Sequence, residues 1–245
     1  MGGRADRDLE SALRGASAIV FDAGNTLLSI NYGVVAEALR ASGRAVGEDA
    51  VREAEWRARP RFDDKLAALR STETVPAFRA YCDAIFEGLG VKPGPLADAA
   101  YERIRAHNAA TNLWDAPIAG AKKAVADVAR AGYAVGVISN SRGTIEAHLV
   151  SLGLADDLLF VIDSGVVGVE KPDRRIFALA EARLALPPDR CVYVGDLFSV
   201  DVLGARAAGW RAVLVDPAGA WAERPCARVR DVSHLRDAAL AASRR

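Results

Sequence analysis

Short runs of apolar residues recur along the chain, and each ends abruptly at a small or acidic residue. These runs are Ala18 to Phe21, Ala134 to Ile138, Leu158 to Ile162, Cys191 to Val194 and Ala212 to Val215. They are rich in β-branched or aromatic residues and do not alternate with polar ones, which is typical of strands buried on both faces. The pattern therefore predicts five strands of one parallel sheet.

Segments with the period of an amphipathic helix lie between these predicted strands. They are Ala119 to Ala131, Thr144 to Leu152, Arg174 to Leu184 and Ser199 to Ala208. The last one is followed by Gly209, where we expect a left-handed helix C-cap. Strands and helices that alternate in this way indicate an α/β fold with a doubly wound parallel sheet.

The interval from residue 29 to residue 112 has a different pattern, with helical periods and no convincing strand. Glycines and prolines interrupt it, among them Gly43, Pro60 and Gly90, and we interpret them as turns between helices. The sequence thus predicts a helical domain at 29–112, inserted into an α/β core domain made of residues 1–28 and 113–245.

Composition narrows the range of partners. The chain has 245 residues, 51% of them hydrophobic, which suffices for a core and a sizeable insertion. Lys+Arg and Asp+Glu both number 32, so no net field favours nucleic acid or an anionic membrane. We expect neither partner, and any anion must bind through a local cluster of charges.

The cysteines and the N-terminal residues indicate the cellular compartment in which we expect the protein. The three cysteines, Cys82, Cys191 and Cys226, lie far apart and match neither a disulfide framework nor a Cys-x-x-Cys metal site. Met1 to Ala16 is charged and lacks the apolar stretch of a signal peptide, and no run of about 18 apolar residues occurs. We expect a cytoplasmic protein with reduced thiols.

Polar residues follow the predicted strands at the edge where a parallel sheet binds ligands. Asp22, Ser139 and Asp163 each come directly after an apolar run, and Asp196 follows one glycine later. Carboxylates that converge on one edge repel each other unless a cation lies among them, and a few oxygen ligands suit Mg²⁺. Electrostatics alone therefore points to a magnesium site, with Asp163 more easily explained as a loop carboxylate.

Four segments, in this order, resemble the four motifs of the haloacid dehalogenase superfamily. They are Phe21 to Leu27, Val137 to Asn140, Glu170 to Pro172 and Val194 to Asp201. Each alone is weak evidence, but together they are specific. The resemblance implies a Rossmann-like core with a helical cap domain after the first strand, and a hydrolase that is phosphatase-like.

The resemblance also implies roles for individual residues. Asp22 would be the nucleophile that forms an aspartyl-phosphate, with Thr26 orienting its turn. Ser139 would donate a hydrogen bond to a phosphoryl oxygen, and the adjoining Asn140 is a further candidate for substrate binding. Lys171 would neutralise both the phosphate and the crowded carboxylates.

The metal assignment rests on the same resemblance. Asp22, the backbone carbonyl of Gly24 and Asp196 would hold Mg²⁺. Asp201 resembles a second acidic position of the family that orients Lys171 or a metal-bound water. The expected substrate is a small phosphorylated metabolite, and the expected oligomeric state is a monomer or a homodimer.

One position departs from the family's phosphatases. Most of these carry an aspartate two residues after the nucleophile as general acid and base, where this chain has Gly24. Three interpretations follow: a phosphatase for good leaving groups, a phosphate-binding or regulatory protein with little turnover, or C–X or C–P chemistry. Dehalogenases lack the metal that Asp196 and Asp201 indicate, and a phosphonatase would need a lysine such as Lys65.

The helical insertion contributes one further candidate cluster, close to Pro60. Its members could present cations and an aromatic wall to an anionic substrate. A solvated basic helix face with one buried tryptophan is the simpler expectation. The cluster consists of Trp56, Arg57, Arg59, Arg61 and Lys65.

Overall fold

A computed structural model describes residues 2–244 of the chain, with side chains from residue 6 onward. The chain divides into two compact units, a core unit up to Leu28 and from Pro117 onward, and a helical unit, Ser29–Ala116. The assignment of residues 1–28 and 113–245 to a core domain and of residues 29–112 to a cap domain stays a prediction.

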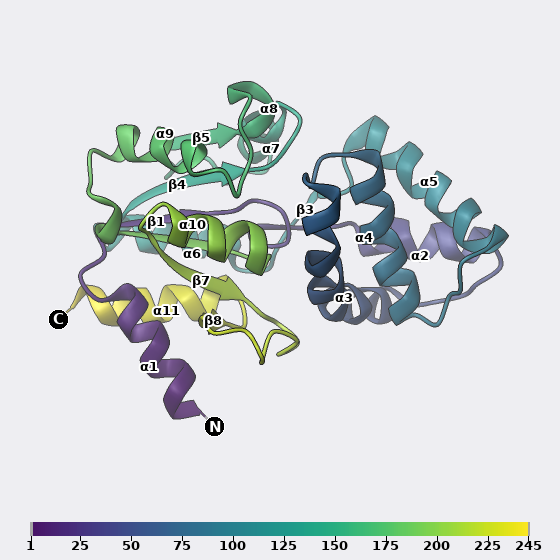
Figure 1. Ribbon diagram of the computed structural model, residues 1–245, viewed down its shortest axis with the longest axis horizontal. Coiled ribbons are helices and arrows are strands. Elements are labelled where there is room, and N and C mark those ends of the chain that lie inside the picture. The colour runs from purple at the N-terminus through teal and green to yellow at the C-terminus, as the bar shows by residue number, and fades with distance from the viewer. Residues whose placement is uncertain (1, 245) are drawn as a thin grey trace. The chain divides into compact units, whose positions relative to one another are not determined.

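The core unit contains a parallel sheet of six strands in the order β5-β4-β1-β6-β7-β8 (Figure 1). The predicted α/β fold with a parallel sheet is therefore confirmed. All five predicted strands are present, and β8 is an addition, because its three residues are too few to give an apolar pattern. The strands are β1 (Ala18–Phe21), β4 (Ala134–Ser139), β5 (Phe160–Asp163), β6 (Cys191–Gly195), β7 (Arg211–Val215) and β8 (Ala227–Val229).

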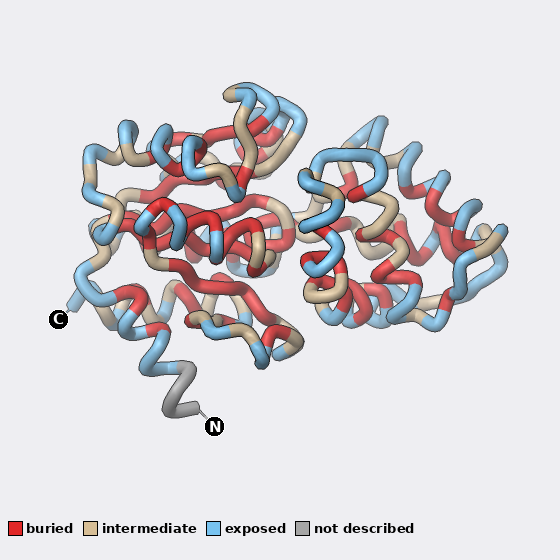
Figure 2. Tube along the Cα trace, in the orientation of Figure 1, coloured by how far each residue is buried: buried red, intermediate tan, exposed pale blue. Residues whose placement is uncertain are grey.

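Alternating residues of the central strands supply the core. Ala18 and Val20 of β1 pack in one buried cluster with Phe177 and Ala205, which belong to helices that cover that face of the sheet. Figure 2 shows the strands of the core unit largely buried, with the exposed residues on the helices and in the loops. The helices of this unit are α1 (Gly2–Leu13), α6 (Ala121–Arg130), α7 (Ile145–Ser151), α8 (Ser164–Val167), α9 (Arg174–Leu184), α10 (Leu203–Ala207) and α11 (Val232–Ser243), with a 3-10 helix η1 (Pro188–Arg190) and a π-helix η2 (Phe198–Val202).

The helical unit contains four helices, and its sequence pattern predicts this helical character. Asn31 and Thr74 begin two of them, because each side chain accepts a hydrogen bond from a backbone N–H of the first turn. The helices are α2 (Tyr32–Ala41), α3 (Glu48–Leu69), α4 (Val75–Gly88) and α5 (Pro95–Thr111). The chain enters and leaves the unit through a two-stranded sheet, β2 (Leu28–Ser29) with β3 (Ala116–Pro117).

The prediction that Pro60 separates two helices is wrong. Pro60 lies inside α3, which continues to Leu69. A proline inside a helix removes one backbone hydrogen bond and crowds the preceding turn, but tertiary packing can outweigh that cost. Ala58 and Phe62 are buried on either side of Pro60, so packing holds the helix together across it.

The expectation of a solvated basic face on this helix is also wrong in two places. Arg59 is 2% exposed, and its guanidinium donates to both oxygens of Glu55, which is itself fully buried. Trp56, by contrast, is only half-buried. Arg59 therefore belongs to an internal ion pair and does not offer a free cation, because a buried guanidinium needs a partner.

Within residues 2–244, none of the helices combines the length and the apolar character needed to cross a bilayer.

Candidate active site

The register of the sheet brings the predicted site residues to one edge. Phe21, the last residue of β1, is paired with Val137 of β4 and Val194 of β6. The residues that follow these strands therefore leave the sheet at the same edge. This edge holds Asp22, Ser139 and Asp196, as the sequence predicts for the carboxyl ends of parallel strands.

The turn after β1 is closed by backbone hydrogen bonds. The Asp22 N–H donates to the Val194 carbonyl at 2.8 Å, which extends the ladder by one residue. The Ala23 carbonyl then accepts from the N–H groups of Leu27 and Leu28, both at 2.9 Å, and Asn25 adopts a left-handed conformation with φ 54°. Asparagine tolerates this conformation better than most residues. The turn therefore fixes Asp22 at the edge.

Lys171 is the centre of the site. Its ammonium donates to Asp22 Oδ1 at 2.7 Å, to Asp201 Oδ1 at 2.8 Å and to the Tyr193 hydroxyl at 2.7 Å. Burial works against the charged ammonium, but the carboxylates of Asp201 and Asp22 outweigh it and raise the pKa of Lys171 above its ordinary value. The raised pKa favours the charged ammonium, and through it Lys171 joins two carboxylates from distant parts of the chain.

Asp22 is buried beside that cation. Burial raises the pKa of Asp22 to about 6, although the charge of Lys171 opposes the shift and the charge of Asp201 reinforces it. A desolvated carboxylate is more reactive toward an electrophile than a hydrated one. At neutral pH Asp22 is still mostly ionised, as a nucleophile or a metal ligand must be.

Asp201 lies in the π-helix η2 and is held on both sides. Its Oδ2 accepts from the N–H groups of Asp196 and Leu197, at 3.0 and 2.9 Å, while Oδ1 accepts from Lys171. A Cβ at position 195 would lie 2.4 Å from the Asp201 carboxyl carbon, so only glycine fits there. Single-turn π-helices are frequent at functional sites.

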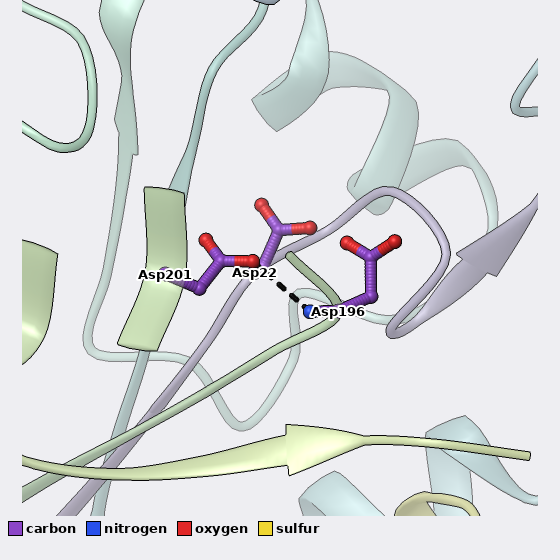
Figure 3. A group of neighbouring side chains, drawn as sticks. All are labelled: Asp22, Asp196 and Asp201. Carbon is purple, nitrogen blue, oxygen red and sulfur yellow. Dashed lines mark hydrogen bonds between the residues drawn. The ribbon is translucent and has the colours of Figure 1, made fainter. Parts of the chain in front are cut away.

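Three carboxylates meet in this site, those of Asp22, Asp196 and Asp201, each with an oxygen within 4.8 Å of the others (Figure 3). The donor set consists of oxygens and carries more negative charge than Lys171 balances, which fits a divalent cation such as Mg²⁺. Because both Asp201 oxygens already accept hydrogen bonds, Asp22 and Asp196 are the better candidates for direct ligands. Gly24 lies two residues after Asp22, in the same turn.

The loop after β4 contains the two predicted substrate-binding residues. Ser139 is 3% exposed, and its hydroxyl donates to the Asn140 carbonyl at 3.3 Å. The Asn140 side-chain amide donates to the Lys171 carbonyl at 3.0 Å and accepts from the Lys171 N–H at 2.8 Å. Asn140 thus forms two hydrogen bonds with the backbone of Lys171. In this arrangement its side-chain amide faces the loop that contains Lys171.

Two further predicted positions are buried at this edge. Thr26 is fully buried, and its hydroxyl has no hydrogen-bond partner among the described residues. Asp163, expected as a loop carboxylate, is the last residue of β5, and its oxygens accept from the N–H groups of Gly143, Ile145 and Gly165. Asp163 therefore shapes the loop after β4, and these bonds leave it little capacity to bind a ligand.

Tyr193 is a site residue that sequence reasoning missed. It lies within the apolar run of β6 and is fully buried, yet its hydroxyl contacts Lys171. The available signal was a phenol inside a strand whose other residues carry no hydroxyl. A buried phenol usually has a hydrogen-bond partner, so a tyrosine in this run indicates a polar contact inside the sheet.

Comparison with known proteins supports a family assignment. A family model described as haloacid dehalogenase-like hydrolase matches residues 16–209. The chain resembles glyceraldehyde 3-phosphate phosphatase of Methanothermobacter thermautotrophicus, with 40% identity over 110 residues, 44% of this chain and 48% of that protein. It resembles phosphoserine phosphatase of Thermus thermophilus, with 40% identity over 93 residues, 38% of this chain and 37% of that protein. The alignments thus span less than half of these relatives.

Solved structures agree on the fold. A dehalogenase with an intermediate complex matches at a TM-score of 0.61 and 19% identity, covering 91% of this chain and 96% of that one. The putative HAD-hydrolase YfnB from Bacillus subtilis, bound to magnesium, matches at a TM-score of 0.61 and 16% identity, covering 91% and 98%. At such identities the likeness concerns the fold alone.

Proposed function

Because this chain belongs to the haloacid dehalogenase-like hydrolase family, we propose that it is a Mg²⁺-dependent phosphatase that uses Asp22 as its nucleophile. The observation that carries the proposal is the ammonium of Lys171, bound to both Asp22 and Asp201 beside a third carboxylate. Phosphoryl transfer requires mainly positioning and charge neutralisation, and this cluster supplies both.

The proposed reaction has two steps at Asp22. One carboxylate oxygen attacks phosphorus, the bond from phosphorus to the leaving-group oxygen breaks, and an aspartyl-phosphate and an alkoxide or phenolate form. Water then attacks the aspartyl-phosphate, which releases inorganic phosphate and restores the carboxylate. Ser139 donates a hydrogen bond to a phosphoryl oxygen, Lys171 offsets the added negative charge, and Thr26 orients the turn.

The residues present suit a magnesium ion. Asp22 and Asp196, with the Gly24 carbonyl, would hold it, and when bound it offsets charge on the phosphoryl oxygens. Asp201 keeps Lys171 in place and, through its bonds to the N–H groups of Asp196 and Leu197, fixes the backbone that carries one of the ligands. This division of roles follows from the hydrogen bonds that already occupy Asp201.

The proposed substrate class is a small phosphorylated metabolite. The names of the two reported relatives support it, since glyceraldehyde 3-phosphate and phosphoserine are both of this kind. The balanced total charge is consistent with this substrate class, because the chain has no net positive charge that would attract a polyanion.

A panel of phosphorylated metabolites, assayed for phosphate release with Mg²⁺ and with EDTA, tests the proposal. We expect hydrolysis of at least one compound, lost in EDTA and restored by excess Mg²⁺. A protein that binds phosphate compounds without hydrolysing any of them, p-nitrophenyl phosphate included, is not a phosphatase. That result would favour a binding or regulatory protein, for which the glycine at position 24 is the specific observation.

Binding of Mg²⁺ is expected to weaken about tenfold between pH 7.5 and pH 5, because a proton and the cation compete for Asp22. Burial raises the pKa of Asp22 to about 6, so the carboxylate is mostly ionised above that pH and mostly protonated below it. Calorimetric titration of the metal-free protein measures the two affinities. In Asp22→Asn the affinity should be lower and the pH dependence reduced. Equal affinities of the unaltered protein at both pH values would contradict the assignment of Asp22 as a ligand.

A further inference from the structure

Tyr193 joins the catalytic cluster to the interior of the sheet. Its hydroxyl lies 2.7 Å from Lys171 Nζ and 2.6 Å from the carbonyl oxygen of Ile138. Its ring is fully buried and meets the ring of Phe177 edge-on, with centroids 5.3 Å apart. The phenol is therefore fixed from both ends, by packing at the ring and by two hydrogen bonds at the oxygen.

The direction of both hydrogen bonds follows from chemistry. A carbonyl only accepts, so the single Tyr193 proton goes to Ile138, and an ammonium only donates, so the phenol oxygen accepts from Lys171. The ammonium has three hydrogens, and the other two go to Asp22 and Asp201. Tyr193 thus supplies the third acceptor, so that each of the three N–H bonds of the ammonium points to a fixed partner.

We propose that Tyr193 is a positioning residue that aims Lys171 at Asp22, a role that rests on the proposed function for its catalytic effect. A neutral acceptor suits this place, because a third carboxylate around the ammonium would add negative charge where the phosphoryl group must arrive. Without the hydroxyl, the ammonium would keep two acceptors and could turn about the Cε–Nζ bond and tilt away from Asp22. The carbonyl of Ile138 would lose its donor as well.

Tyr193→Phe isolates the hydroxyl, since phenylalanine keeps the ring and its contact with Phe177. Tyr133→Phe is the matched control, because the hydroxyl of Tyr133 also donates from a buried site to a backbone carbonyl, that of Ala239, at 3.1 Å. Tyr133 does not contact Lys171 in the described structure. Both variants lose a buried phenol oxygen, but only one changes the surroundings of the lysine.

The ammonium can be observed directly by NMR in protein labelled with the heavy nitrogen isotope at lysine Nζ. Lys171 is buried and the chain's other lysines are exposed, so its hydrogens should exchange with water far more slowly. We expect one persistent ammonium signal in the unaltered protein and in Tyr133→Phe. In Tyr193→Phe the signal should shift and exchange faster. Loss of the signal in Lys171→Arg assigns it.

Kinetics with p-nitrophenyl phosphate provide the second measurement. We expect Tyr193→Phe to lower kcat about 10- to 100-fold, the range of a hydrogen bond to a charged group, with KM changed less than about twofold. Tyr133→Phe should keep both constants. An unchanged ammonium signal in Tyr193→Phe, or an altered signal with unchanged kcat, would overturn the proposal. If the unaltered protein hydrolyses no phosphate ester, the proposed function fails, and the ammonium signal alone decides whether Tyr193 positions Lys171.

Discussion

Replacing Asp22 with asparagine is expected to lower the release of phosphate from p-nitrophenyl phosphate, in Mg²⁺, by at least about 10⁴-fold. An amide oxygen is a poor nucleophile toward phosphorus and cannot give a stable acyl phosphate. The substitution also removes one negative ligand from the metal site and one anionic partner from Lys171. Steady-state assays at saturating substrate measure the loss.

The loss of activity should come from the missing nucleophile and not from unfolding, because asparagine has the size of aspartate and its side-chain oxygen can still accept from Lys171. Burial raises the pKa of Asp22, which means that ionising this residue costs the folded protein stability at pH 7.5. This cost is present above the folded-state pKa of about 6 and disappears at acidic pH. The neutral variant does not bear it, so we expect its melting temperature at pH 7.5 to equal or exceed that of the unaltered protein.

Asp216→Asn is the matched control for this experiment. Asp216 is also a buried acid directly after a strand of the sheet, but its oxygens accept from the backbone N–H groups of Ala220 and Trp221. We expect activity within about twofold of the unaltered enzyme, since the asparagine oxygen can keep one of these bonds. More than about a tenth of the activity remaining in Asp22→Asn would contradict the nucleophile assignment.

Introducing an acid at position 24 is expected to raise the hydrolysis of alkyl phosphates about 100-fold or more, and that of aryl phosphates only slightly. General acid catalysis is typically worth about 10²–10⁴-fold, and the gain is largest where the leaving alkoxide is basic. A nitrophenolate leaves without a proton, so the same acid does little for it. Comparing kcat for glycerol phosphate and p-nitrophenyl phosphate in Gly24→Asp measures the difference.

The backbone at position 24 can carry a side chain. Gly24 is half-buried and does not occur among the glycines of the described chain that have positive φ. Gly24→Asn is the control, because it has the same size and no carboxylic proton, and it should show no gain on either substrate. Equal gains of Gly24→Asp on both phosphates would show that a missing acid does not limit this enzyme.

The strand ends of the site could be predicted because they follow from periodicity. Asp22, Ser139 and Asp196 come after apolar runs, and parallel strands bring their carboxyl ends together whatever the connections are. Lys171 has no such signal, since it lies on an irregular loop before α9, and only its resemblance to a family motif identified it. The role of Tyr193 depends on a contact between β6 and a distant loop, which no local pattern encodes.

Predictions failed where packing overrides local preference. Pro60 is a helix breaker by propensity, and α3 continues through it because residues on either side are buried. Arg59 carries a charge, which is typical of surface residues. It is buried because it forms an ion pair with Glu55, one helical turn earlier. In both cases the outcome depends on contacts between residues, and a pattern built from single-residue preferences does not include such contacts.

The two short strands at the junction of the units have an evolutionary consequence. The chain departs at β2 and returns at β3, which are hydrogen-bonded neighbours, and the Ser29 hydroxyl donates to the Ala116 carbonyl at 3.4 Å. Because exit and entry are adjacent, insertions, deletions or wholesale replacement of the intervening helices need not displace the sheet. Selection can therefore diversify the residues between these strands while Asp22, Asp196, Asp201 and Lys171 are inherited unchanged.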